Sequence, residues 1–555
     1  MNVKRFIFSI LLLLGCNSEP ARLIIFNAKV WTVDQKNPVA EAVVVQGNRI
    51  EYVGSSDSAL TFKNGNSRIL DAGHRLMLPG FNDAHLHFLS GGMQMMNINL
   101  ISCKTLAEIQ RRIAEKVAEP GKNKWITGRG WDHTVFNKGI WPHRVMIDSV
   151  SLDNPVFIRR VDGHVGWANT SAIKAAGIDD KTISPEGGEI LRDENGVPTG
   201  IFKESAMSLI ERVIPPPDES QKLLAIHKAL EHARKLGITS VQDNSGIYSI
   251  KLYNKLDEMN ELTLRISEWM DFDLLRKPDS LLKTIQHYEP YSKNNILRLG
   301  LLKGFVDGTL GSRTALLFEP YSDDRSTTGL PQYSEEELTK MICLAESLKY
   351  QVGLHAIGTR ACWMALNGFS LAKEQYGLRD SRHRLEHAQI LLPEDIKRIG
   401  ELNVVASMQP THCTSDLRWA YERLGRRCEG AYAWKQILQN EGKIAFGTDW
   451  PVEPLDPMRG LYSAVTRKHI DTNLPIGGWY PDERLRIEKA IELYTLGSAF
   501  AEFQEHIKGS IEQNKLADLI LLSKNILSVP PADILTTRVE LTVFDGEIVY
   551  RSSSL

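Results

Sequence analysis

A repeated alternation of short apolar runs with helix-like stretches is the feature of this sequence that most constrains its fold. The intervening stretches have helical spacing, and in 334–348 the three glutamates at 335–337 suit the N-terminal turn of a helix. Eight strands alternating with helices predict an α/β protein built on a (β/α)8 TIM barrel, in which functional residues gather at the C-terminal strand ends. The candidate strands are 78–87, 238–243, 264–268, 299–307, 351–355, 384–387, 404–408 and 444–449.

Both ends of the chain have a different, β-rich pattern. Near the N-terminus, apolar runs such as 42–45 are separated by Asn, Gly and Ser turns. The runs 517–522 and 539–550 have the same pattern near the C-terminus. We therefore expect one small β-sheet domain made from residues 21–78 and 507–555, with residues 79–506 forming the barrel.

A long insertion interrupts the barrel pattern after its first strand. About 150 residues separate the first candidate strand from the second, which is too long for an unstructured loop. This stretch contains strand-like runs at 124–128 and 155–160 and a hairpin pattern at 187–200. We expect an inserted subdomain over about residues 100–225.

The first residues resemble an export signal. Two basic residues precede an apolar run at 6–14 that is too short to span a bilayer. The run closes in Leu-Leu-Gly-Cys at 13–16, which resembles the bacterial lipoprotein signal; the alternative is an ordinary signal peptide with a chance cysteine. On the favoured interpretation residues 1–20 are signal and tether and Cys16 is lipidated. The body of the protein would then lie at the bacterial cell envelope, on its periplasmic or extracytoplasmic side.

The composition limits the partners of the chain. Hydrophobic residues make up 42% of the sequence and charged residues 24%, and the formal net charge is -2. This balance gives no reason to expect nucleic acid or an anionic membrane surface as a partner, so a small-molecule substrate is favoured; a homo-oligomer is compatible with it. The cysteines after residue 16 are widely separated and have no Cys-x-x-Cys spacing, which argues against a disulfide framework or a thiolate zinc site.

Ionisable residues collect at the predicted strand ends. His85 and His87 are two residues apart on the first candidate strand, so both imidazoles face the same side. His355 ends the fifth candidate strand, His387 the sixth and Asp449 the eighth. Imidazole nitrogens and a carboxylate around one opening suit zinc or another divalent first-row metal. The sequence therefore predicts a divalent-metal site.

Lys303, on the fourth candidate strand, needs a separate interpretation. A protonated lysine carries hydrogen-bond donors and no acceptor, so it cannot bind a metal in that form. One interpretation pairs it with a nearby carboxylate such as Asp307.

A set of motifs spread along the chain resembles one protein family. Pro-Gly-Phe-Asn-Asp-Ala-His-Leu-His at 79–87 and Gly-Thr-Asp-Trp-Pro-Val at 447–452 are two of them. With these motifs the chain resembles the amidohydrolase superfamily of metal-dependent hydrolases, in particular its branch that includes N-substituted formamide deformylases. The resemblance covers nearly everything after the signal, and its further motifs are 128–132, 162–169, 303–315, 355–358, 386–388 and 517–520.

The resemblance implies a barrel with a flanking β-sandwich and a divalent-metal site, usually zinc. It implies that a first metal is held by His85, His87 and Asp449. A second metal would be held by His355 and His387. Lys303 matches the position where many relatives carry a lysine carboxylated by carbon dioxide, which bridges two metals. The alternative is a single-metal site with an unmodified lysine.

The expected reaction is hydrolysis of a carbon–nitrogen amide bond, other than a peptide bond, in an N-acyl or N-formyl small molecule. Metal-activated hydroxide would attack, and Asp449 would be the catalytic residue that accepts a proton and passes it to the leaving nitrogen. Deaminases of the superfamily place a glutamate shortly after the fifth-strand histidine, and residues 356–359 contain none. The alternatives are a cyclic amide or ester hydrolase and a non-catalytic binding lipoprotein.

Candidate substrate contacts lie in the insertion. An aromatic side chain with polar neighbours suits an amide that carries an apolar substituent, so the candidates are Trp131, Asp132, His133 and His164. The alternative is that the tryptophan only packs the insertion and that His164 is a structural histidine. Arg313 is expected to contact either a substrate carboxylate or a backbone carbonyl at the barrel end.

Overall fold

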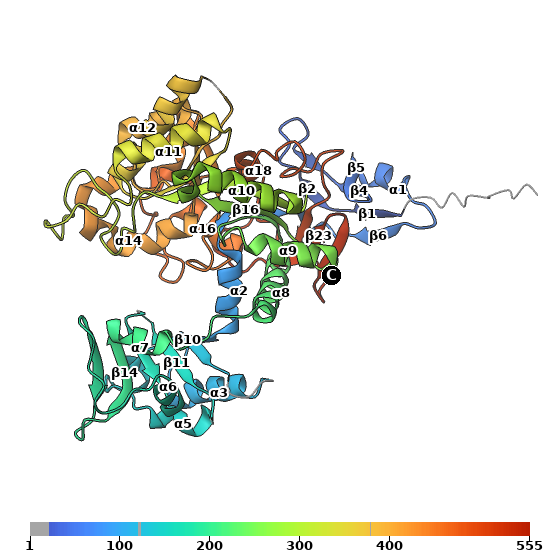
Figure 1. Cartoon of the computed structure of the whole chain (residues 1–555). Coiled ribbons are helices and arrows are strands. Elements are labelled where there is room, and N and C mark those ends of the chain that lie inside the picture. The colour runs from blue at the N-terminus through green and yellow to red at the C-terminus, as the bar shows by residue number, and fades with distance from the viewer. Residues whose placement is uncertain (1–20, 120–123, 152, 162, 293, 378) are drawn as a thin grey trace, which may run out of the picture. The chain divides into compact units, whose positions relative to one another are not determined.

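The computed structural model describes residues 21–119, 124–151, 153–161, 163–292, 294–377 and 379–555. The predicted signal, with Cys16, lies outside these described residues. The chain divides into two compact units (Figure 1): the first holds residues up to 86 together with 233–250 and 256–555, and the second holds 87–232 and 251–255. In the described part of the chain, no helix is long and apolar enough to cross a bilayer.

Eight strands of the first unit form the barrel that the alternation predicts. Their order is β21-β20-β19-β18-β17-β16-β15-β8, and every pairing between neighbours is parallel. The two ends of this order meet where the backbone N–H of Asp449 donates to the carbonyl of His85 at 2.7 Å. The expected α/β barrel is therefore confirmed. Its strands are β8 (Phe81–Leu86), β15 (Ile238–Asp243), β16 (Arg265–Asp271), β17 (Leu297–Phe305), β18 (Val352–Ala356), β19 (Arg384–His387), β20 (Val405–Met408) and β21 (Lys443–Phe446).

The helix α11 (Glu335–Ser347) shows why the segments between strands are helical. Ser334 caps it by accepting a hydrogen bond from the backbone N–H of Glu337, and three glutamates fill its first turn, as the sequence predicts. Its apolar face is buried, and it packs against α12 (Thr359–Tyr376). The other helices between barrel strands include α10 (Pro278–Tyr288) and α14 (Pro410–Leu424), both labelled in Figure 1, and α13 (Pro393–Glu401) and α15 (Trp434–Gln439).

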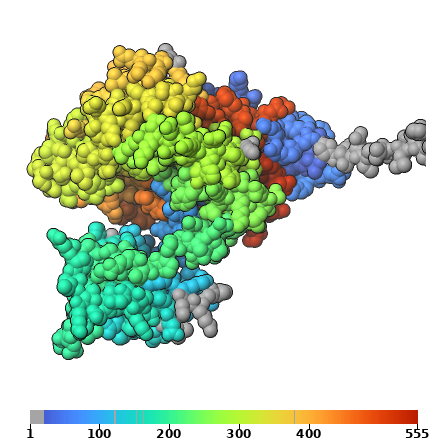
Figure 2. Space-filling model, in the orientation of Figure 1, coloured from blue at the N-terminus to red at the C-terminus, as the bar shows by residue number. Residues whose placement is uncertain are grey.

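Two further sheets of the first unit are formed near the ends of the chain, and one of them combines strands from both ends. One has the order β5-β4-β1-β6 and the other β24-β23-β22-β7-β2-β3. In the second sheet, β22 (Leu519–Leu522) pairs with β7 (Leu76–Pro79), so in Figure 2 the blue and red ends of the chain lie side by side. A shared apolar core includes Ile25, Val43, Met77, Leu521 and Val543. The remaining strands are β1 (Arg22–Phe26), β2 (Lys29–Trp31), β3 (Val39–Ala40), β4 (Ala42–Gln46), β5 (Arg49–Gly54), β6 (Arg68–Asp71), β23 (Val539–Phe544) and β24 (Glu547–Arg551).

The second unit has a sheet and a core of its own. Its six strands have the order β13-β14-β12-β11-β10-β9, and β13 with β14 forms the hairpin expected near 187–200. Its helix α3 (Leu106–Val117) begins with a capping box between Thr105 and Glu108. Its strands are β9 (Ile98–Asn99), β10 (Ile126–Trp131), β11 (Val156–Arg160), β12 (Val165–Ala168), β13 (Gly188–Arg192) and β14 (Pro198–Glu204).

Candidate metal centre

The predicted metal ligands come from strands β8, β18 and β19 and from the segment after β21. His85 lies in β8, and His87 directly follows that strand. His355 lies in β18, and His387 is the last residue of β19. Asp449 comes three residues after β21 ends at Phe446. His387 and Asp449 have backbone φ of 75° and 58°, a left-handed conformation that non-glycine residues adopt mainly where function or tight packing requires it.

Two groups of side chains have donor atoms close enough to share an ion. In each group the donor atoms lie within 4.8 Å of one another, and Asp449 belongs to both. The two groups are His85, His87 and Asp449, and His387, His412 and Asp449. The first is the ligand set expected for a first metal, and the second contains a histidine that the sequence analysis did not select.

In three of the predicted histidine ligands, one ring nitrogen is held by an oxygen acceptor. The Nδ1 of His85 lies 2.7 Å from Oε2 of Glu386, and the Nδ1 of His387 lies 2.8 Å from Oε1 of Gln409. The Nε2 of His355 lies 3.0 Å from the carbonyl oxygen of Gly308. Because these acceptors take an N–H, the opposite ring nitrogen of each histidine carries the lone pair that a metal needs.

Burial keeps these histidines neutral. Removal from water is the largest cause and lowers the pKa of His85 to about 4 and that of His355 to about 3. Burial, followed by the neighbouring His355, lowers the pKa of His387 well below its usual value. Neutral imidazole is the form that binds a metal, so the donor set fits a divalent ion at neutral pH.

The amine of Lys303 is buried without a polar partner among the described residues. Lys303 is 3% exposed, and its Nζ lies 4.4 Å from the ring centre of Phe305. Burial lowers its pKa to about 8. The pairing with Asp307 considered from the sequence is wrong, because that carboxylate accepts the backbone N–H groups of Leu316, Ile357 and Gly358.

Comparisons with known proteins identify the family of the chain. A model of the amidohydrolase family matches residues 68–550. The chain belongs to the amidohydrolase family. This amidohydrolase is 32% identical over 535 residues to the putative amidohydrolase YtcJ of Bacillus subtilis, which covers 94% of this chain and 98% of the relative. It is 25% identical over 548 residues to the N-substituted formamide deformylase of Arthrobacter pascens, covering 95% of this chain and 98% of the relative.

A solved structure supports the same assignment. The crystal structure of an uncharacterized metal-dependent hydrolase from Pyrococcus horikoshii is 29% identical, with a TM-score of 0.74, and covers 92% of this chain and 99% of its own. The family match and this neighbour support a metal-dependent amidohydrolase.

His412 is the residue of the centre that sequence reasoning missed. It lies in the first turn of α14, and its Nε2 is 3.7 Å from Oδ2 of Asp449. The sequence analysis looked for ligands at strand ends, whereas His412 comes four residues after β20 ends at Met408. Pro410 was an available signal, because proline in the first turn marks a helix that starts at the C-terminal end of the preceding strand.

The candidate substrate residues of the insertion have partners inside the second unit. Trp131 is fully buried in its core and donates from Nε1 to the carbonyl of Ile158 at 2.8 Å. Asp132 caps the short helix α4 (His133–Phe136) and accepts a hydrogen bond from Arg160 at 3.0 Å. These contacts give both residues a structural role, and their contact with a substrate stays a prediction.

The two histidines of that set differ in exposure. His133 is buried and stacks on Trp141 with 3.9 Å between ring centres. The side chain of His164 is 67% exposed, and its Nδ1 lies 3.0 Å from Glu204. A role of either in substrate binding also stays a prediction.

Arg313 has a partner that the sequence analysis did not consider. Its guanidinium donates to both carboxylate oxygens of Asp323, at 3.2 and 2.9 Å. Arg423 donates to the same carboxylate. Arg313 therefore ties its own loop to α14 through Asp323.

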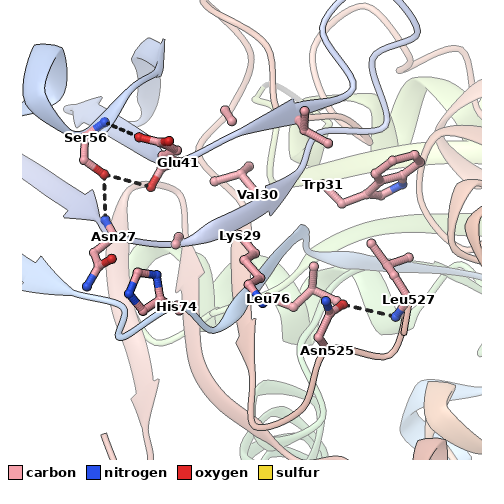
Figure 3. A pocket seen from close by; sticks show the side chains of 13 residues that line it. Asn27, Lys29, Val30, Trp31, Glu41, Ser56, His74, Leu76, Asn525 and Leu527 are labelled. Atoms are coloured by element: carbon pink, nitrogen blue, oxygen red, sulfur yellow. Dashed lines mark hydrogen bonds between the residues drawn. The ribbon is translucent and has the colours of Figure 1, made fainter. Parts of the chain in front are cut away.

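A separate hollow lies among strands β2 and β3 and neighbouring segments from both ends of the chain (Figure 3). Its volume is about 580 Å³, and its lining includes Trp31, Val39, Glu41, His74 and Leu527. None of the predicted metal ligands lines it. The hollow therefore carries none of the chemistry of the barrel centre.

Proposed function

We propose that this protein hydrolyses a carbon–nitrogen amide bond, other than a peptide bond, in an N-acyl or N-formyl small molecule. The observation that carries the proposal is the set of neutral histidines whose second ring nitrogens are already held by Glu386, Gln409 and Gly308. Such an arrangement orients imidazole lone pairs toward a metal before any ion binds.

A bound divalent ion, zinc in the first instance, would acidify a water molecule and polarise the substrate carbonyl. Asp449 supplies the carboxylate beside these ligands, with Oδ1 3.7 Å from Nε2 of His85. In the proposed reaction Asp449 accepts a proton from the attacking water and delivers it to the leaving nitrogen. Its backbone fixes it in place, because its N–H donates to the carbonyl of His85.

Lys303, once converted to a carbamate, would supply oxygen ligands to the divalent metal. A pKa of about 8 leaves part of the amine neutral near pH 7.5, and a neutral amine adds to carbon dioxide with loss of one proton to give a carbamate. The product is anionic and has oxygen acceptors, which the amine lacks. Its burial without a polar partner in the described part of the chain supports this assignment.

The substrate class draws on the relative that is named N-substituted formamide deformylase. The test is a metal-depleted sample of the purified protein, reloaded with Zn²⁺, Mn²⁺ or Ni²⁺ and assayed against N-formyl amines, N-acyl amines, cyclic amides and esters. We expect metal-dependent, EDTA-sensitive release of amine from N-formyl or N-acyl compounds. Preferential hydrolysis of cyclic amides or esters would overturn the substrate class, and metal binding without any hydrolysis would indicate a binding lipoprotein.

The lipidated N-terminus is a second part of the proposal. It rests on Leu-Leu-Gly-Cys at 13–16 after a short apolar run. Expression of the full chain in bacteria fed an alkyne fatty acid should label the protein and place it in the membrane fraction. The Cys16→Ser variant should lose both, and labelling of that variant would contradict the assignment.

A further inference from the structure

Three residues at the passage from β20 into α14 carry buried polar atoms that no described residue pairs. The atoms are Nε2 of Gln409, Oγ1 of Thr411 and Nε2 of His412. Gln409 and Thr411 are 1% exposed and His412 is 9% exposed. Buried polar groups are nearly always hydrogen-bonded. Three unpaired polar atoms within residues 409–412 therefore indicate a place that accepts a polar ligand.

These atoms lie beside the metal ligands. Oε1 of Gln409 accepts from Nδ1 of His387 at 2.8 Å, which fixes the amide and leaves its NH2 group for another acceptor. The Nε2 of His412 is 3.7 Å from Oδ2 of Asp449, which is beyond hydrogen-bond length. The NH2 group of Gln409 and the Nε2 of His412 therefore stay available for another partner next to His387 and Asp449.

The start of α14 favours a negatively charged oxygen. The helix has 15 residues, and no side-chain cap forms at Gln409 in the described structure. The unsatisfied N–H groups of a helix N-terminus carry partial positive charge and attract anions. The unpaired side-chain nitrogens of Gln409 and His412 lie at the same turn and add to this attraction for an anion.

His412 also lies beside the metal ligand His387. The ring centres of the two histidines are 5.8 Å apart, with 21° between the ring planes. At this position a neutral imidazole either donates an N–H or binds an ion, and the zinc content of the variants distinguishes the two roles.

We propose that the first turn of α14 binds the oxygen of the scissile amide carbonyl, with His412 as a catalytic residue that donates from Nε2 and Gln409 as a second donor. The inference rests on the proposed function, because it requires an amide carbonyl to react beside Asp449. The water oxygen bonds to the carbonyl carbon, and the π electron pair moves to the carbonyl oxygen, where the two N–H groups stabilise its charge. When the pair returns, the C–N bond breaks and the nitrogen takes the proton that Asp449 holds.

Three variants of the full chain, all loaded with zinc, test this assignment. His412→Leu removes the donor at similar bulk, and His412→Gln keeps an N–H donor on a side chain of similar reach. Glu422→Gln is the control on the same helix, at a side chain that is 70% exposed. The measurements are bound zinc per chain by mass spectrometry, the calorimetric Kd of methylphosphonate as a tetrahedral oxyanion probe, and kcat and KM on the best amide of the substrate panel.

We expect all variants to hold as much zinc as the original protein. His412→Leu should weaken methylphosphonate binding about tenfold or more and lower kcat about 10²-fold with little change in KM, as loss of one oxyanion donor does elsewhere. His412→Gln should recover most of the methylphosphonate affinity and most of kcat. Glu422→Gln should change neither the affinity nor kcat. Loss of zinc from both His412 variants would make it a metal ligand and overturn the proposal, as would unchanged probe binding and kcat in His412→Leu. An original protein that holds zinc but hydrolyses none of the panel would instead refute the proposed function, and the inference with it.

Discussion

The Nδ1 of His85 lies 2.7 Å from Oε2 of Glu386, and both side chains are almost completely buried. Glu386 also forms an ion pair, 2.7 Å long, with Nε of Arg384. Arg384 donates in turn to the carbonyl of Ala84 and to the hydroxyl of Ser407. The orientation of one metal ligand therefore depends on a series of buried polar contacts that joins β8, β19 and β20.

The variant Glu386→Gln should lower metal affinity about 10- to 100-fold, because loss of a charged partner leaves His85 less basic and less firmly held. It should also lower the thermal midpoint of the metal-free protein, because Arg384 stays buried with its charge uncompensated. Equilibrium dialysis with zinc and differential scanning fluorimetry measure the two effects. The control Glu336→Gln, at an exposed residue of α11, should change neither. Unchanged zinc affinity in Glu386→Gln would contradict this role.

Two buried lysines should respond in opposite ways to the same substitution. Lys303 has no polar partner among the described residues, whereas Nζ of Lys508 lies 2.8 Å from Glu502. In metal-free, carbon-dioxide-free buffer, Lys303→Met should raise the free energy of unfolding by about 1–3 kcal/mol, since it removes an unsatisfied buried amine. Lys508→Met should lower it, because it leaves Glu502 without its partner. Thermal midpoints compare them, and a loss of stability in Lys303→Met would show that its amine is paired.

The carbamate itself has a direct readout. Protein prepared with ¹³C-bicarbonate and zinc should show a carbamate carbonyl signal by NMR that is absent from Lys303→Met. The same substitution should reduce bound zinc from about two ions per chain to about one, because a bridging ligand is lost. A protein with two zinc ions and no carbamate signal would contradict the bridge.

The barrel could be predicted from the alternation of apolar runs with helix-like stretches. The histidines that lie in these runs could be predicted from the same pattern. His85, His355 and His387 lie in expected strands, near their C-terminal ends. These ends meet at one face of a parallel barrel, so the three side chains could be predicted to lie together. Asp449 lies beyond its strand, where Gly447 and Thr448 turn the chain over the carboxylate of Asp83, and no local pattern specifies that turn.

His412 and Arg313 show what the sequence did not determine. His412 reaches the centre from a helical turn, and strand periodicity does not report such positions. Arg313 meets Asp323, ten residues away along an irregular loop, where many pairings satisfy the same charges. Side-chain partners in loops and first turns depend on tertiary packing, which periodicity does not contain.

Two variants test whether residues of the insertion have a packing role or contact the substrate. Trp131→Ala should destabilise the second unit by about 3–5 kcal/mol, since it removes a fully buried indole from its core. His164→Ala removes an exposed side chain and should change the thermal midpoint little. If His164 contacts substrate, its loss raises KM with a normal thermal midpoint, and an unchanged KM contradicts that role. Limited proteolysis of both variants separates unfolding of the insertion from loss of recognition.

A buried cluster around Glu346 should make the stability of the first unit fall with acid. The carboxylate of Glu346 lies 3.0 Å from Nε2 of His383 and 2.7 Å from Nη2 of Arg379. Burial opposes ionisation, but these partners outweigh it and lower the pKa of Glu346. His383 is held neutral, because burial lowers its pKa and its Nδ1 accepts the backbone N–H of Val352.

Both shifts act in the same direction on stability. A lowered carboxyl pKa gives stability that is present above the unfolded value of about 4.3 and is lost as pH falls through the folded value. The lowered pKa of His383 means that the unfolded chain takes up a proton first as pH falls below about 6.5, which also favours unfolding. The thermal midpoint should therefore decrease steadily from pH 7 to pH 3.

Glu346→Gln should lower the free energy of unfolding by about 1–3 kcal/mol at pH 7, because it removes the charge that pairs with Arg379. This difference should shrink below about pH 4.3, where the carboxyl group takes up a proton in the unfolded chain while it stays ionised in the native protein. The exposed control Glu374→Gln should follow the original protein at every pH, and a Glu346→Gln curve that stays parallel to it down to pH 3 would show that this carboxylate does not drive the acid response.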